Sequence, residues 1–201
     1  MPHAGYNRRY SLKQTSAPAT NPITTDEAKD HARITISSED TLIDTYIAAA
    51  TRLFETYIGR QLVTATWRMK MEAFPAWTIL VPRPPFASVT SLAYVDTAGD
   101  AQTLTLTTDY VIDTDAEPGT IEPAFDQSWP TTRTQTGAVT ITYVAGYGAA
   151  ASVPDLFKTA IKELVVHWFE QRNLFLTGTI GKKIELMWDS IVDSEQVVEF
   201  A

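Results

Sequence analysis

The chain has 201 residues, of which 44% are hydrophobic, and carries a formal net charge of −8 with no cysteine. This size allows one core of ordinary dimensions plus a smaller satellite, and the missing cysteines exclude disulfides, thiolate nucleophiles and cysteine-ligated zinc. The acidic charge argues against a protein that grips nucleic-acid phosphates, because that binding draws on clustered Lys and Arg.

Residues 1–22 are rich in Ser, Thr, Pro and Asn, and their pattern predicts a flexible basic N-terminal arm. The arm holds Arg8, Arg9 and Lys13 but no acid. Two interpretations stay open: the arm contacts DNA or an acidic protein surface, or it is a solvated terminus with incidental charges. The first residues lack the apolar middle of a secretory signal, and no apolar run reaches the roughly 18 residues of a membrane span, so we expect synthesis in the cytoplasm.

Two helices are predicted next. Thr24 and Glu27 form a capping-box pattern that begins a short helix. Residues 39–59 carry apolar groups at three-and-four spacing, with Ser37 or Ser38 as the expected cap and Gly59 as the expected end.

The middle of the chain changes to strand periodicity. Residues 63–71 alternate apolar and polar side chains, as a strand with one buried face does. Further strands are predicted at 77–81, 89–95, 103–106, 110–112, 120–122 and 139–144. Pro84 and Pro85 mark a corner between strands, because proline cannot donate a ladder hydrogen bond.

Helical periodicity returns at Pro154 and continues to about Asn173. The predicted fold class is therefore α+β. Helices from the two ends, residues 23–60 and 153–173, form a helical bundle, residues 61–152 form an inserted and mostly antiparallel β-rich subdomain, and the terminal arms are flexible.

Two segments are candidates for protein contacts. Residues 124–137 lack strand alternation and predict a protruding loop in which Trp129 and Arg133 are interface anchors, unless Trp129 folds back onto the sheet. Residues 174–201 are apolar enough that they either pack on their own body or dock on a partner. The apolar residues of this C-terminal arm are Ile184, Leu186, Trp188, Ile191, Val197, Val198 and Phe200.

No catalytic, cofactor or metal site is predicted, because each candidate lacks part of its pattern. Glu163, His167 and Glu170 share a helix face but need a ligand from another element to hold a metal. The remaining candidates are glycine-rich segments without the spacing of a phosphate loop or of a dinucleotide fingerprint. They are Gly178, Gly181 and Lys182, and Gly146 and Gly148.

The order of these segments resembles the head-tail connector proteins of long-tailed double-stranded DNA phages and the adaptor proteins of gene transfer agents. The resemblance covers roughly residues 23–173. It is carried by the helix end Tyr57, Ile58, Gly59 and Arg60, the Pro82 to Phe86 corner, the strand end from Tyr143 to Gly148, and Val153 with Pro154 before the last helix.

The resemblance implies a non-enzymatic structural protein of the virion neck, assembled in the host cytoplasm. Copies would form a ring, about twelvefold by family analogy, beneath the portal protein. The ring would complete the head after DNA packaging and offer a docking surface to the tail or to a stopper protein. DNA would pass through its channel without sequence-specific binding.

The resemblance also implies that the C-terminal arm engages the portal, although its last twenty residues depart from the shorter endings of the family. Two other classes stay open. A tail-completion or other virion interaction protein would bind tail-tube proteins instead of the portal. A small hydrolase would depend on single carboxylates such as Glu163 or Glu170.

Overall fold

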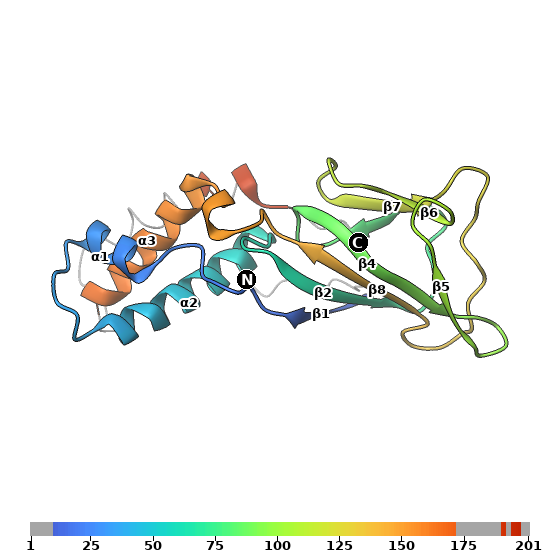
Figure 1. The fold of residues 1–201 in the computed structure, drawn as a ribbon, viewed down its shortest axis with the longest axis horizontal. Helices are drawn as coiled ribbons and strands as arrows, with labels where there is room; N and C mark the ends of the chain where they lie inside the picture. The colour runs from blue at the N-terminus through green and yellow to red at the C-terminus, as the bar shows by residue number, and fades with distance from the viewer. Residues whose placement is uncertain (1–9, 172–189, 192–193, 198–201) are drawn as a thin grey trace. The chain divides into compact units, whose positions relative to one another are not determined.

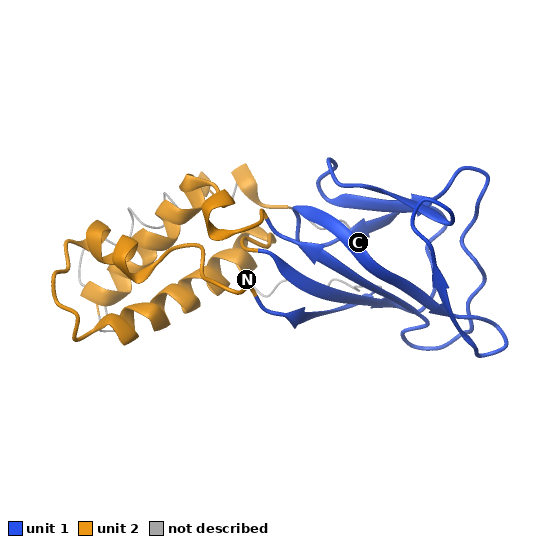
Figure 2. Cartoon of the chain, in the orientation of Figure 1, with its two compact units in different colours: residues 1–17, 64–146, 198–201 blue, residues 18–63, 147–197 orange. Residues whose placement is uncertain are grey.

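The computed structural model describes residues 10–171, 190–191 and 194–197. In this part the chain is an α+β protein in which one strand precedes the first two α-helices and seven antiparallel strands lie between the second and third α-helices (Figure 1). It divides into two compact units (Figure 2). The strand unit contains residues 1–17, 64–146 and 198–201, and the helical unit contains residues 18–63 and 147–197. No described helix has the length and apolar content needed to cross a membrane.

The helical unit begins with α1 (Thr25–Ala32), whose predicted capping box is confirmed. The Thr24 hydroxyl accepts from the Glu27 amide at 3.1 Å, and the Glu27 carboxylate accepts from the Thr24 amide at 2.7 Å. These two bonds satisfy amides that would otherwise lack a partner at the start of a helix.

The long helix α2 (Asp40–Ile58) ends as predicted at Gly59, which adopts a left-handed conformation with φ of 71°. Its predicted serine cap is wrong. The N-cap is Glu39, which makes no side-chain capping bond, and its carbonyl accepts from the amides of Leu42 and Ile43 at 3.0 Å. The helix therefore begins beyond the reach of the two serines.

The unit is completed by a short 3₁₀ turn at Ala150–Ser152 and by the predicted last helix, α3 (Asp155–Glu170). Pro154 is its N-cap and not a first-turn residue, and the helix ends three residues before the predicted Asn173. Helices α2 and α3 pack through their apolar faces, where the Phe54 and Phe157 rings lie 5.5 Å apart between centroids. The fully buried members of this core include Ile43, Ile47, Ala50, Phe54, Ile58, Phe157, Ala160 and Ile161.

The strand unit contains two sheets. The large sheet has the order β1-β2-β8-β4-β5 and the small sheet has the order β3-β7-β6, with every strand pair antiparallel. Their bounds are β1 (Tyr10–Ser16), β2 (Ala65–Met71), β3 (Ile79–Val81), β4 (Phe86–Val95), β5 (Ala101–Leu104), β6 (Tyr110–Asp113), β7 (Gly119–Pro123) and β8 (Val139–Ala145). The strands predicted between residues 63 and 144 are thus present, with shifted ends.

The flexible arm predicted over residues 1–22 is wrong at Tyr10–Ser16, which forms β1. This strand pairs with β2 along its length, and Tyr10 and Leu12 pack on the core while Ser11 and Lys13 are exposed. Pairing with β2 supplies the hydrogen bonds that this polar segment could not provide for itself.

The inner faces of the two sheets share one apolar core, whose members include Met69, Ile79, Val81, Phe86, Leu92, Ile121, Val139, Ile141 and Tyr143. The Tyr143 hydroxyl donates to the Pro82 carbonyl at 2.8 Å beside the predicted proline corner between β3 and β4. On β7, Gly119 lies against Phe86 so closely that an added Cβ would stand 2.5 Å from the Phe86 Cβ. The Phe86 side chain of β4 therefore packs directly on the backbone of β7 at this point, where Gly119 leaves room for it.

Candidate interaction surfaces

The described part of the predicted C-terminal arm packs on the helical unit. Ile191 is only 6% exposed and belongs to the helical core. The Val197 amide donates to the Ile58 carbonyl at 3.1 Å, and the Gln196 side chain donates to the Tyr57 carbonyl at 3.2 Å. The other predicted docking residues, Ile184, Leu186, Trp188, Val198 and Phe200, lie outside the described residues.

Arg60 holds this returning segment. Its side chain is 8% exposed, and its Nε donates to the Glu195 carbonyl oxygen at 2.8 Å. One terminal nitrogen lies 3.8 Å from the Glu195 carboxylate, and the other lies 3.3 Å from the Tyr147 hydroxyl. Arginine suits this position because its fixed fork can serve several acceptors at once without losing its charge.

The 124–137 loop brings Trp129 back onto the strand unit. The indole stacks on the Phe74 ring, with centroids 4.7 Å apart and an interplanar angle of 2°, and its Nε1 donates to the Trp77 carbonyl oxygen. The alternative in which Trp129 covers the sheet therefore describes its packing. The aromatic residue that the loop presents to solvent is Phe125, which is 97% exposed.

Arg133 is exposed, and its backbone is fixed by a bond from its amide to the Val95 carbonyl at 3.0 Å. Its guanidinium lies beside Gly99, where an added Cβ would stand 2.5 Å from a terminal nitrogen. Its charged group therefore stays at the surface, next to the turn that joins β4 and β5.

One of the carboxylates considered for a metal site has a partner on another helix. Glu163 on α3 lies 3.1 Å from the His31 ring of α1. The described residues contain no group of three histidine or acidic side chains arranged to hold a metal ion. Glu163 and His31 instead form a polar contact between two helices.

The glycines at the end of β8 belong to a turn. The Gly146 amide donates to the Pro85 carbonyl at 2.9 Å, and both Gly146 and Gly148 have positive φ, of 124° and 117°. Glycine is needed for these backbone angles. The other glycine-rich candidate, with Gly178, Gly181 and Lys182, lies outside the described residues.

The outer face of the large sheet is basic and rich in hydroxyl groups. Lys13 on β1 stands opposite Arg68 on β2, and Lys70 is two residues further along β2 on the same face. The uncharged strand positions that share this face include Ser11, Ser16, Thr66, Thr140, Thr142, Val144, Ser88, Ser91, Ala93, Val95, Ala101 and Thr103. These strand positions include no acidic residue.

The outer face of the small sheet has the opposite charge. Asp113 on β6 and Glu122 on β7 alternate with core residues, and Asp115 follows in the turn. Leu80 on β3 and Val111 on β6 share this face and are each 43% exposed. The surrounding stretch of sequence, from residue 84 to residue 132, has no Lys or Arg.

Asp96 organises the turn between β4 and β5. One carboxylate oxygen accepts from the amides of Ala98, Gly99 and Asp100 at 2.9 to 3.0 Å, and the other accepts from the Gln102 side chain at 2.8 Å. These bonds, led by that of Gln102, hold the pKa of Asp96 below its ordinary value. The low pKa has a structural cause and indicates no catalytic group.

The strand unit and the helical unit together make an α+β protein, and its candidate functional sites are exposed surfaces. The sequence matches the family described as head completion protein over residues 22–192, and the chain belongs to that family. A search of curated proteins gave no match.

Three solved structures share the fold. A chain described in the neck of an empty gene transfer agent particle computed with C6 symmetry has a TM-score of 0.79 and 22% identity, covering 95% of this chain and 97% of its own. A chain from the neck of a native particle computed with C12 symmetry has a TM-score of 0.76 and 21% identity, with coverages of 95% and 97%. A chain from the virion of a native gene transfer agent particle has a TM-score of 0.74 and 21% identity, with coverages of 94% and 97%.

Sequence reasoning did not identify the basic outer face, because Lys13 was assigned to a flexible arm. The alternation of Tyr10 and Leu12 with Ser11 and Lys13 was the available signal. Phe125 was also missed, because Trp129 and Arg133 were predicted as the interface anchors of this loop.

Proposed function

We propose that the chain is a structural head-tail connector of the virion neck, which forms an oligomeric ring beneath the portal and completes the head after DNA packaging. Membership of the head completion family over residues 22–192 carries this proposal. Similarity of fold over 95% of the chain to proteins of gene transfer agent necks supports it. The ring would give the tail or a stopper protein its attachment surface and form part of the DNA channel.

We further propose a division of work between the units. The helices of residues 23–60 and 153–173 would act as a bundle against neighbouring copies, and the strand-rich insert would face outward or toward the tail. The net charge of −8 suits a channel through which DNA slides, since like charges discourage lasting contact with phosphates. No step of this function requires an enzymatic activity or a cofactor.

Portal docking is proposed for the C-terminal arm. Because Ile191 and Val197 contact the helical unit, the proposal depends most on Ile184, Leu186, Trp188, Val198 and Phe200. Truncation after Thr179 would remove the arm but also the buried Ile191 side chain. A sharper test compares Trp188→Ser with Ile191→Ala: portal docking by the arm predicts that the first reduces portal recovery, and loss of the buried Ile191 side chain should lower the free energy of unfolding.

The loop of residues 124–137 is proposed as a second contact. Its exposed Phe125 and Arg133 suit a protein partner, because aromatic and arginine side chains are favoured interface anchors. Trp129 would then support the loop from below through its stack on Phe74.

The direct test is to tag the full chain, recover it from cells that produce particles, and determine the native mass and composition of the complex. A ring-sized assembly that contains portal subunits is the expected result. Recovery with tail proteins alone would replace the proposal by a tail-completion role, and recovery without any structural partner would reject both.

A further inference from the structure

The basic face of the large sheet places like charges side by side, an arrangement that does not stabilise a single copy of the chain. We define this basic face by Lys13, Arg68 and Lys70. Lys13 and Arg68 are direct cross-strand partners in the antiparallel pair of β1 and β2. Like charges in this position repel and weaken a sheet. Among the described residues, none of the three takes part in an ion pair.

The acidic face of the small sheet carries the opposite charge and belongs to the same strand unit. We define it by Asp113, Asp115 and Glu122, with Leu80 and Val111 as its apolar centre. The two apolar side chains are 43% exposed, and Glu122 lies beside them at the pairing position of Val111. An apolar centre with a charged rim is the composition of a protein interface.

The two faces cannot neutralise each other within one copy. Each is the reverse side of a sheet whose other side packs on the shared core of Leu92, Ile121 and Ile141. They therefore look in opposite directions, separated by a two-layer sandwich whose sheets are about 10 Å apart. A second copy can bring its acidic face to the basic face of the first.

We propose that the basic face of one copy contacts the acidic face of the next copy in the assembled ring, so that strand units as well as helical units meet between neighbouring copies. The contact joins two different surfaces of identical chains, which is the head-to-tail interface that closes into rings when the rotation between copies is suitable. This inference rests on the proposed connector function and assigns the residues of its subunit contact. Opposite charges would also fix the orientation of each added copy.

Duplex DNA is the other anion that could meet the basic face. Three positive charges would neutralise few phosphates, and a chain with a net charge of −8 would repel the rest of the duplex. The acidic face also carries exposed apolar side chains that a DNA contact would leave unexplained. The second copy is therefore the better occupant.

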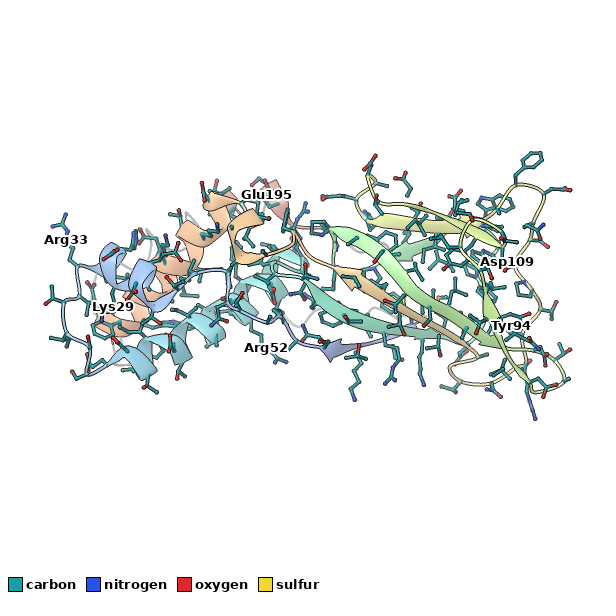
Figure 3. The ribbon with its side chains drawn as sticks, in the orientation of Figure 1. Lys29, Arg33, Arg52, Tyr94, Asp109 and Glu195 are labelled. Carbon is teal, nitrogen blue, oxygen red and sulfur yellow. The ribbon has the colours of Figure 1, made fainter. Side chains whose placement is uncertain are left out.

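A charge-swap experiment tests the contact. The first variant, Lys13→Glu with Lys70→Glu, reverses the net sign of the basic face and leaves Arg68 in place. The second, Asp115→Lys with Glu122→Lys, reverses the acidic face and leaves Asp113, which accepts from two turn amides. The control, Arg33→Glu with Arg52→Glu, makes the charge change of the first variant at exposed positions of the helical unit (Figure 3).

Each full-length variant is expressed in particle-producing cells that lack the wild-type copy, and the amount of chain in purified particles is measured. Circular dichroism confirms that each variant is folded. Each face variant alone should be recovered at least tenfold less than wild type, because like-charged faces meet. Coexpression of the two face variants should restore recovery, since copies can then alternate. The control alone should match wild type. Coexpression of the first variant with the control should leave recovery of the first variant low, because the control carries no reversed acidic face.

Normal recovery of either face variant, or failure of coexpression to restore recovery, would overturn the proposed contact. The connector function would still stand in that case, provided that the wild-type chain is recovered in particles. Absence of the wild-type chain from particles would reject the connector function itself, and the contact with it. If the first variant formed normal rings but lost binding to a 30-base-pair DNA duplex in a filter assay, the basic face would be a DNA surface.

Discussion

The Arg60 side chain donates from Nε to the Glu195 carbonyl oxygen at 2.8 Å, across 135 residues of sequence. This bond joins Arg60, two residues beyond the end of α2, to the returning C-terminal segment within the helical unit. Next to it, the Val197 amide donates to the Ile58 carbonyl, which is one of the last backbone acceptors of α2. The returning segment therefore caps the end of a core helix.

Replacement of Arg60 should release this segment. Arg60→Ala removes a charge-assisted hydrogen bond and leaves the Glu195 carbonyl without that donor, so the free energy of unfolding should fall by about 2 kcal/mol. Hydrogen exchange measured by mass spectrometry should become faster at the Val197 amide. Arg52→Ala, at an exposed position of α2, is the matched control and should leave both quantities unchanged. Unchanged exchange at Val197 in the Arg60 variant would show that the segment is held by other contacts.

The sequence carries little local information about this contact. Helices α1 and α2 were predicted because their signals are local: a capping box at Thr24 and an apolar stripe that ends at Gly59. The Arg60 bond depends on a partner far along the chain. Strand β1 was missed for another reason: its alternation is a local signal, but the polar composition of residues 1–22 favoured a flexible arm.

The close approach of Gly119 to Phe86 makes a sharp prediction about the strand unit. An alanine Cβ would stand 2.5 Å from the Phe86 Cβ, so β7 would have to move away from the core. Gly119→Ala should therefore lower the free energy of unfolding by about 2 kcal/mol, as overpacking of a core does. Thermal and urea unfolding would measure it. Thr120→Ala, one residue along on the outer face, should change the free energy by less than about 0.5 kcal/mol.

A Gly119→Ala variant as stable as wild type would mean that the two sheets can separate at this point without loss. That outcome would also weaken the case for a rigid sandwich that holds the basic and acidic faces in opposite directions.

In the loop of residues 124–137, we expect Trp129 to stabilise the fold and Phe125 to contact a partner. Trp129→Ala removes a stacked, partly buried ring from Phe74 and should lower the free energy of unfolding by about 2 to 3 kcal/mol. Phe125→Ser changes a side chain that is 97% exposed and should alter stability by less than about 0.5 kcal/mol. Denaturant titration compares the two variants.

Recovery of the chain with its structural partners gives the second readout for this loop. We expect Phe125→Ser to reduce that recovery although the protein remains as stable as wild type. Equal recovery would place the tail or portal contact elsewhere. Sequence reasoning could find the loop but not this division, because which aromatic folds inward depends on Phe74, which lies far away in sequence.

The capping box of α1 predicts a pH dependence. The Thr24 amide donates to the Glu27 carboxylate at 2.7 Å, and this bond, which outweighs the effect of burial, lowers the pKa of Glu27 below its ordinary value of 4.5. A lowered pKa in the folded state means that the stabilisation is fully present above the pKa of the unfolded chain. It is lost as the pH falls through the folded-state pKa.

Wild type should therefore be more stable than Glu27→Gln at about pH 6, and the difference should shrink as the pH falls below about 4.5. The free energy of unfolding measured by urea titration across this range gives the comparison. Asp26→Asn is the matched control because it removes one negative charge from the same helical turn but leaves the capping box intact. The glutamine variant can still cap the helix through a neutral bond, so helix α1 should persist in its circular dichroism spectrum. A stability difference that stays constant from pH 6 to below pH 4 would contradict a charged capping bond, and would assign the role of Glu27 to packing.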